Sequence, residues 1–194
     1  VKPEDVNGFA SDIYRESQRL IALVEDIIHL SRLDEGGDGL KMEPVDLLEL
    51  ARQTARRLEP VARRAEVAME VKGSPAQITG VPAVLDEMVF NLCDNAVKYN
   101  RAGGSVTISV EPGEHETVLT VQDTGIGIPD QDRDRVFERF YRVDKSHSRQ
   151  IGGTGLGLSI VKHAAALHDA RIDLDSTLGK GTTIRVSFPN ERGK

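Results

Sequence analysis

Residues 105–129 read SVTISVEPGEHETVLTVQDTGIGIP, and this stretch decides the fold. Apolar residues alternate with polar ones over 106–110 and again over 118–123. A period of two is typical of strands with one buried face, so two paired strands are predicted around a turn at 112–116. The sequence therefore predicts a hairpin that ends in a carboxylate and a glycine-rich loop.

Similar patterns extend outward along the chain. Helices are predicted at 46–64, 81–99 and 156–168, and further strands at 40–45, 66–71, 171–175 and 183–188. The hairpins cluster apart from the helices, which favours the α+β class over a doubly wound fold. We expect a two-layer α/β sandwich, in which helices cover one face of a mixed sheet.

One long amphipathic helix is predicted ahead of this domain, from about Glu4 to Glu35. Its apolar residues recur at spacings of three, four and seven, namely Phe9, Ile13, Leu20, Leu23, Val24, Ile27, Leu30 and Leu33. Such a stripe buries little unless it packs on a partner, so a helical hairpin or a dimer is expected. The run GGDG then marks a boundary. The predicted division is a helix at 1–35, a linker at 36–39, a domain at 40–190 and a tail at 191–194.

Composition narrows the class of protein. With 194 residues and 39% hydrophobic content, the chain can bury one sizeable core, which excludes a wholly disordered protein. The net charge of −6 argues against general binding to nucleic acid. A lone Cys93 excludes a disulfide framework and fits a reducing compartment. No apolar run approaches the roughly 20 residues that span a bilayer, and no signal peptide is recognisable at Val1. A soluble, cytoplasmic chain is expected.

Asp123 is the first candidate site residue. Period-two geometry places its carboxylate on the same face as Leu119 and Val121, where a charge is costly without a donor. The glycines that follow leave space against the backbone for a flat ligand, and a base with an amino group would supply that donor. The alternative is that Asp123 only caps the turn.

A second candidate is the polar edge of the helix predicted at 81–99. Glu87, Asn91, Asn95 and Lys98 fall about a turn apart beside an apolar stripe. Asparagine is a poor helix former, so this edge suggests a function. Amide oxygens suit hard cations and a lysine suits phosphate, so a magnesium triphosphate would satisfy the edge. The alternative is that this edge is only a solvent-exposed polar face of the helix, with no function.

A basic island and a glycine run follow. Arg139, Arg142, Lys145 and Arg149 stand within 13 residues of an otherwise acidic chain, directly before GGTGLGLS. Glycines that open a helix with unpaired N–H groups form an anion cradle. The run matches neither a Rossmann fingerprint nor a P-loop. His163 and His168 lie five apart and miss a common helix face, so zinc is not expected.

The ordered motifs NLCDNAVKY, DTGIGIP, FERFYR, GGTGLGLSIVKH and GKGTT resemble the ATP-binding domain of bacterial sensor histidine kinases, in the larger ATPase group that includes gyrase and Hsp90. VEDIIHLSRLDEG also resembles the end of the second helix of their dimerisation and phosphotransfer hairpin. The resemblance implies a kinase that passes the γ-phosphoryl group of Mg-ATP to a histidine, for relay to a response regulator. It further implies a homodimer through the N-terminal helix and a parent protein anchored in the membrane, with no nucleic-acid partner.

The resemblance also implies roles for single residues. Asp123 would bind the adenine amino group, Thr182 would support it, and Asn95 would hold Mg²⁺. Asn91, Lys98 and Arg142 are the expected catalytic residues. Residues 137–153 would form a lid over the phosphates. The full expected nucleotide site is Asn91, Asn95, Lys98, Tyr99, Asp123, Gly125, Gly127, Ile128, Arg142, Lys145, Gly153, Thr154, Gly155, Leu156, Gly157, Leu158 and Thr182.

Asn91 and the missing acceptor separate the alternatives. Hydrolytic relatives such as gyrase are expected to carry a water-activating Glu four residues before the Mg-binding Asn, whereas the amide of Asn91 takes no proton. A kinase is therefore favoured over a self-contained ATPase. No acceptor box like H-E-[LI]-[KR]-T-P occurs, and His29 lacks its acidic neighbour, so the histidine lies elsewhere. The alternative of a nucleotide-binding scaffold without kinase activity stays open. Asp169 and Ala170 stand where the family often has a pair of glycines, so the conformation of that turn is in doubt.

Overall fold

The computed structural model describes residues 40–143 and 154–190, together with positions 9–10, 13–14, 16–17, 20–21, 23–24 and 28. Its centre is a five-stranded sheet of order β2-β4-β5-β7-β6. The strands are β2 (Ala68–Gly73), β4 (Ser105–Pro112), β5 (Glu116–Asp123), β6 (Arg171–Thr177) and β7 (Gly181–Pro189). Strand β2 runs parallel to β4 and the other neighbours are antiparallel, so the predicted mixed sheet is confirmed.

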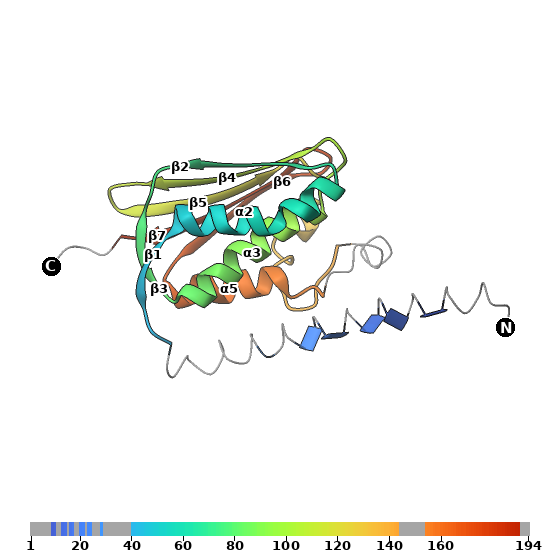
Figure 1. Cartoon of the computed structure of the whole chain (residues 1–194), viewed down its shortest axis with the longest axis horizontal. Coiled ribbons are helices and arrows are strands. Elements are labelled where there is room, and N and C mark those ends of the chain that lie inside the picture. The colour runs from blue at the N-terminus through green and yellow to red at the C-terminus, as the bar shows by residue number, and fades with distance from the viewer. Residues whose placement is uncertain are drawn as a thin grey trace.

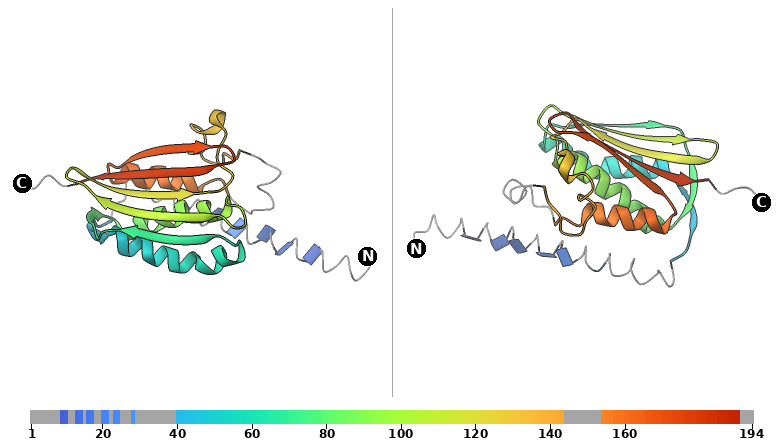
Figure 2. Two further views of the ribbon diagram at one scale, coloured as in Figure 1. Left: turned by 90° about the horizontal axis from the view of Figure 1, so that it is seen from above. Right: turned by 180° about the vertical axis from the view of Figure 1, so that it is seen from behind.

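Three helices cover one face of this sheet, as Figures 1 and 2 show. They are α2 (Leu47–Arg64), α3 (Pro82–Lys98) and α5 (Gly157–Leu167). The core between the layers is aliphatic, and the predicted stripe of α3, from Leu85 to Ala96, is buried in it. Polar side chains such as Thr120 and Arg185, paired across β5 and β7, lie on the other face. The predicted two-layer α+β sandwich is confirmed.

One strand pair was not predicted. Strand β1 (Glu43–Asp46) pairs antiparallel with β3 (Gln77–Gly80) in a separate two-stranded sheet. The strand expected at 40–45 is therefore shifted, and β3 was missed altogether. Strand β3 has four residues with one buried apolar side chain, Ile78, which is too short a pattern to reveal a period of two. Strand β1 leads directly into α2, and β3 leads into α3.

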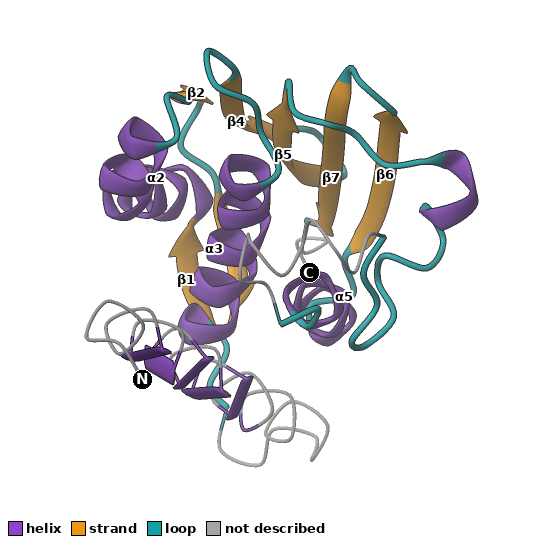
Figure 3. Ribbon diagram, turned by 90° about the vertical axis from the view of Figure 1, so that its right-hand side faces the viewer, coloured by secondary structure: helices purple, strands orange, loops and turns teal. Residues whose placement is uncertain are grey.

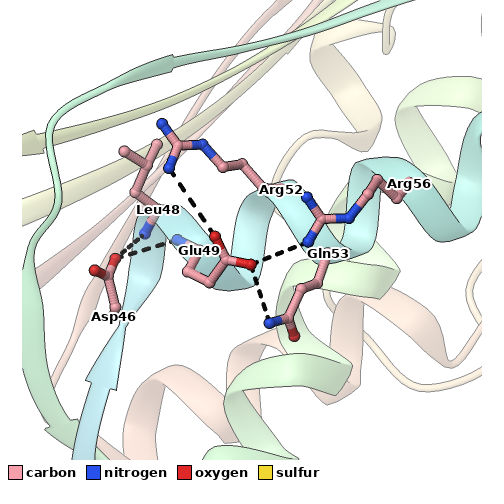
Figure 4. A network of polar contacts seen from close by, with 6 residues as sticks. All are labelled: Asp46, Leu48, Glu49, Arg52, Gln53 and Arg56. Carbon is pink, nitrogen blue, oxygen red and sulfur yellow. Dashed lines mark hydrogen bonds and ion pairs between the residues drawn. The ribbon is translucent and has the colours of Figure 1, made fainter.

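The start of α2 is fixed by local polar contacts, which Figure 4 shows. Asp46 Oδ1 accepts hydrogen bonds from the N–H groups of Leu48 at 2.9 Å and Glu49 at 3.1 Å, as a helix N-cap does. Glu49 in turn accepts from Arg56 at 3.0 Å and Gln53 at 3.2 Å, and these partners hold the pKa of its carboxyl below the ordinary value. Helix α2 therefore begins where the sequence predicted it.

The described positions between 9 and 28 are helical, in agreement with the predicted N-terminal helix. Phe9, Ile13 and Leu20 of its apolar stripe are exposed, whereas Leu23 packs against Leu156 and Ile160 of the α5 region. The predicted linker at 36–39 and the tail at 191–194 lie outside the described residues. No helix within the described ranges is both long and apolar enough to cross a membrane.

Candidate functional site

Asp123 ends β5 and is held by one of its two carboxylate oxygens. Its Oδ1 accepts hydrogen bonds from the N–H of Gly125 at 2.8 Å and of Thr182 at 3.2 Å. Among the described residues, Oδ2 has no hydrogen-bond partner. Burial raises the pKa of this carboxyl, and the two N–H donors act in the opposite direction. Oδ1 therefore caps the turn, as one of the two interpretations predicts. That Oδ2 accepts a hydrogen bond from a ligand stays a prediction.

The loop after β5 lies tightly against the end of α3. Ile126 N–H donates to the carbonyl of Tyr99 at 3.0 Å. A Cβ atom added at Gly125 would stand 2.3 Å from that same carbonyl oxygen, so only glycine fits. Gly127, with φ of +68°, packs as closely on the carbonyl of Thr177 at the end of β6. This packing brings Asp123, the end of α3 and the β6–β7 turn together.

Ser176 is a residue of this end of the site that sequence reasoning missed. Its hydroxyl is 3.0 Å from Thr182 Oγ1, accepts from Ile128 N–H at 2.8 Å and donates to Gly181 O at 3.0 Å. It is buried on the sheet face that also carries Ile184. A serine at a core position of a strand needs partners. No local pattern of the sequence indicated it, because Ile128 lies 48 residues away along the chain. Ser176 connects Ile128 and Thr182, two of the predicted nucleotide residues.

The polar edge of α3 faces the N-terminal end of α5, and the two helices lie side by side in Figure 3. Asn91 Nδ2 donates to the carbonyl of Glu87 at 2.9 Å, which turns its Oδ1 outward from the helix. A Cβ atom at Gly157 would lie 2.7 Å from this Oδ1 and 3.6 Å from Asn95 Nδ2. The structure therefore places the two asparagines beside the glycine run. Lys98, further along the same edge, forms an ion pair with Asp94 at 2.6 Å.

The N-terminal end of α5 presents backbone N–H groups that have no hydrogen-bond partner among residues 40–143 and 154–190. Its N-cap, Leu156, makes no side-chain capping hydrogen bond, and the first N–H bonded within the helix is that of Ile160, to Leu156 O at 2.9 Å. The N–H groups of Gly157, Leu158 and Ser159 precede it. Unpaired donors at the positive end of a helix dipole attract anions. The predicted anion cradle is thus adjacent to Asn91 and Asn95.

The base of the predicted lid contains Arg142, two of whose guanidinium nitrogens have no hydrogen-bond partner among the described residues. Both of these atoms, Nε and Nη2, are buried. The preceding Tyr141 donates its hydroxyl hydrogen to Asp132 at 2.5 Å, and Arg135 stacks on the Tyr141 ring at 4.2 Å. A buried guanidinium without acceptors is costly, so an anionic ligand would satisfy it. Lys145, Arg149 and Gly153 lie outside the described residues.

The donor set fits a magnesium nucleotide better than a metal held by protein alone. Within the described ranges, no group of three His, Cys, Asp or Glu side chains could hold a metal ion. The half-buried amide of Asn95 has no hydrogen-bond partner among those residues and offers one hard oxygen. A Mg²⁺ ion there would take its other ligands from phosphate oxygens and water, which is how this ion commonly binds.

Comparisons with known proteins agree with this geometry. The sequence profile of the family described as "Histidine kinase-, DNA gyrase B-, and HSP90-like ATPase" matches residues 80–192. Sensor-like histidine kinase SenX3 of Mycolicibacterium smegmatis is 38% identical over 96% of this chain and 49% of its own length. Sensor histidine kinase WalK of Bacillus subtilis is 36% identical over 90% of this chain and 29% of its own length. The chain thus spans half or less of these relatives.

Solved structures show the same fold. The mycobacterial sensor histidine kinase MprB is 34% identical, with a TM-score of 0.65 over 76% of this chain and 97% of that one. Full-length ShkA in complex with AMPPNP is 27% identical, with a TM-score of 0.79 over 94% of this chain and 38% of that one. Acinetobacter baumannii histidine kinase AdeS, 22% identical, shares the fold with a TM-score of 0.78 over 99% of this chain and 88% of that one.

The glycine run at the start of α5, the asparagine-bearing helix α3 and the Asp123 turn are the features of an ATPase-type nucleotide-binding domain. This chain belongs to the histidine kinase-, DNA gyrase B-, and HSP90-like ATPase family. Its relatives are sensor histidine kinases, and the resemblance expected from the motifs is confirmed.

Proposed function

We propose that the chain is the catalytic part of a two-component sensor histidine kinase, which binds Mg-ATP and transfers its γ-phosphoryl group to a histidine of the dimerisation domain. The observation that carries the proposal is that Oδ2 of Asp123 has no hydrogen-bond partner in the described part of the chain, while two N–H groups hold Oδ1 in place. Because Oδ1 is fixed by these two hydrogen bonds, Oδ2 has a defined position from which it can accept a hydrogen bond from the amino group of adenine. The complex of ShkA with AMPPNP, an ATP analogue, supports a nucleotide as the ligand of this domain.

The proposed site divides into an adenine end and a phosphate end. At the adenine end, Oδ2 of Asp123 accepts from the amino group, and Thr182 lies beside it. At the phosphate end, the N–H groups of Gly157 and Leu158, with Lys98 and Arg142, meet the phosphate oxygens. Phosphate binding would break the ion pair between Lys98 and Asp94, because the triphosphate carries more negative charge than the Asp94 carboxylate and attracts the ammonium group more strongly. The remaining predicted site residues stay part of this proposal, including Lys145, Arg149 and Gly153.

Catalysis in this proposal is positioning and charge neutralisation. An imidazole nitrogen of the acceptor histidine attacks the γ-phosphorus in line, the bond from that phosphorus to the bridging oxygen breaks, and ADP leaves. Asn95 would hold a Mg²⁺ ion in part, and that ion would supply neutralisation of phosphate charge when bound. Asn91 stands where a hydrolytic enzyme needs a base and cannot remove a proton from water, which favours transfer to histidine over hydrolysis.

The rest of the proposal concerns the parent protein. Residues 1–35 form the second helix of a dimerisation and phosphotransfer hairpin, 36–39 a linker, 40–190 the catalytic domain and 191–194 a tail. The exposed Phe9, Ile13 and Leu20 support pairing with a second copy through that helix. The acceptor histidine lies on the first helix of the hairpin, and the phosphoryl group passes from it to a response regulator. The catalytic domain lies in the cytoplasm, and the parent kinase is anchored in the membrane.

The first test is nucleotide binding by the Asp123→Ala variant. Loss of a hydrogen bond to a charged group should weaken ATP binding by about 10- to 100-fold, measured by isothermal titration. Asp175→Ala is the matched control, since Asp175 is exposed on β6 and points to the sheet face opposite the buried Ser176. If the Asp123→Ala variant binds ATP as tightly as the native chain, the adenine site is assigned wrongly.

The second test separates a kinase from a scaffold. The chain is mixed with a helical hairpin protein that carries the acceptor box and with ATP labelled at the γ-phosphate. We expect acid-labile phosphate on the hairpin histidine. Tight ATP binding without any transfer would support a nucleotide-binding scaffold, and phosphate release without transfer would support a gyrase-type ATPase.

A further inference from the structure

Arg101 joins two loops that are distant in sequence. It follows α3 by three residues, and its Nε donates to Thr124 O at 2.7 Å. Its Nη2 donates to Gly125 O at 3.2 Å and to Gly179 O at 2.8 Å. One guanidinium therefore holds the loop after β5 and the β6–β7 turn against the end of α3. No motif of the sequence pointed to it.

The first of these contacts leads directly to Asp123. The carbonyl of Thr124 and the N–H of Gly125 belong to the same peptide unit. Arg101 donates to the oxygen of that unit, and its nitrogen donates to Asp123 Oδ1 at 2.8 Å. A charged donor at the carbonyl polarises the peptide and strengthens its N–H as a donor, since linked hydrogen bonds are cooperative.

The second donor to Asp123 is built in the same way. Thr182 N–H donates to Oδ1 at 3.2 Å, and the carbonyl of that peptide unit, Gly181 O, accepts from Ser176 Oγ at 3.0 Å. Both peptides that hold Oδ1 are thus themselves held from the carbonyl side. The guanidinium of Arg101 is the charged member of this pair.

We propose that Arg101 is a positioning residue for nucleotide binding, which acts through the Thr124–Gly125 peptide to fix Asp123 with Oδ2 directed to the purine amino group. The inference rests on the proposed function and deepens it. A lysine could not replace Arg101 fully, because a single ammonium lacks the planar fork that reaches three carbonyls on two segments. In this proposal Arg101 acts through its contacts with backbone carbonyls and not by contact with the nucleotide.

A purely structural role makes a different prediction. If Arg101 only ties two surface loops together, its loss lowers stability and alters nucleotide affinity, if at all, independently of Asp123. If it acts through Asp123, its effect depends on the carboxylate. A double-mutant cycle with Asp123→Asn therefore separates the two roles.

The experiment measures the Kd for Mg-ATP by titration calorimetry on the 194-residue chain, well below the melting temperature of each variant. We expect Arg101→Met to weaken binding about tenfold and Arg101→Lys severalfold. We expect Arg101→Met to have little further effect when Asp123→Asn is already present. Arg185→Met is the matched control, since Arg185 is exposed on β7 and, within the described part of the chain, pairs only with Asp173 at 3.8 Å. This variant should bind Mg-ATP as the native chain does.

Native affinity in Arg101→Met or Arg101→Lys, or equal losses with and without Asp123→Asn, would overturn the inference. Should Arg101→Met not fold, the Arg101→Lys cycle decides by the same criterion, since the charge and the aliphatic stem are kept. Failure of the proposed function looks different, because then the native chain does not bind ATP or Asp123→Asn binds it as tightly as the native chain.

Discussion

The imidazole of His168 accepts a hydrogen bond from the backbone N–H of Val81, 2.9 Å from its Nε2. Its Nδ1 lies 2.6 Å from the carbonyl of Ala164, one turn earlier in α5. An Nε2 that accepts and an Nδ1 that donates define the neutral ring. This buried contact ties the end of α5 to the start of α3, the two helices that carry the phosphate end of the site.

This contact predicts a loss of stability in mild acid. Burial lowers the pKa of His168 below its ordinary value, against smaller opposing effects of Ala164 and Asp169. The unfolded chain therefore binds a proton that the folded chain excludes. Stability is complete above the unfolded pKa of about 6.5 and falls as the pH drops from there toward the folded pKa. In urea unfolding, the native chain should lose more stability between pH 7.5 and 5.5 than His168→Gln.

His115→Gln is the control for this measurement. His115 lies exposed in the turn between β4 and β5, and its side chain holds no helices together. The variant should keep the pH dependence of the native chain. If His168→Gln also keeps the native pH dependence, His168 is not the titrating group, and the assignment of a neutral, buried imidazole is wrong.

Asp169 is expected to cost stability at the end of α5. The sequence departs here from the glycine pair of the resembling family, and the structure shows the consequence, since Asp169 has φ of +51°. The left-handed region suits glycine because it has no Cβ atom. Asp169→Gly should therefore raise the free energy of unfolding by about 0.5 to 1 kcal/mol, measured by urea denaturation.

The Asp169→Ala variant tests the cause. It removes the same carboxylate but keeps a Cβ atom, so it should gain no stability. An equal gain in both variants would mean that charge, and not backbone conformation, limits stability at this turn.

Patterns local in sequence explain what could be predicted. Asp123 could be found because a strand of period two and a glycine turn meet within a few residues. The spacing of Asn91 and Asn95 on α3 was equally visible, as was the glycine run that opens α5. Each is a short-range signal, so its element and its face follow from sequence alone.

The supports of the site could not be predicted in this way. Arg101 bonds to Gly179, 78 residues away, and Ser176 bonds to Ile128, 48 residues away. Neither contact has a periodic or compositional signature, since it exists only after β5, β6 and β7 have paired. The sheet order thus creates the surroundings of Asp123, and the sequence reveals only the residue itself.

Gly157 offers the sharpest test of how α3 and α5 share the phosphate end. A Cβ atom there would stand 2.7 Å from Asn91 Oδ1, so Gly157→Ala must displace the end of the Asn91 side chain, which lies beside the first N–H groups of α5. Mg-ATP affinity, measured by calorimetry, should fall by about tenfold or more. Gly103→Ala is the control, because its Cβ would meet nothing within 4 Å while its φ of +78° still imposes backbone strain. That variant should lose stability and keep native affinity. Equal affinities in the two variants would show that the contact between Gly157 and Asn91 does not shape the site.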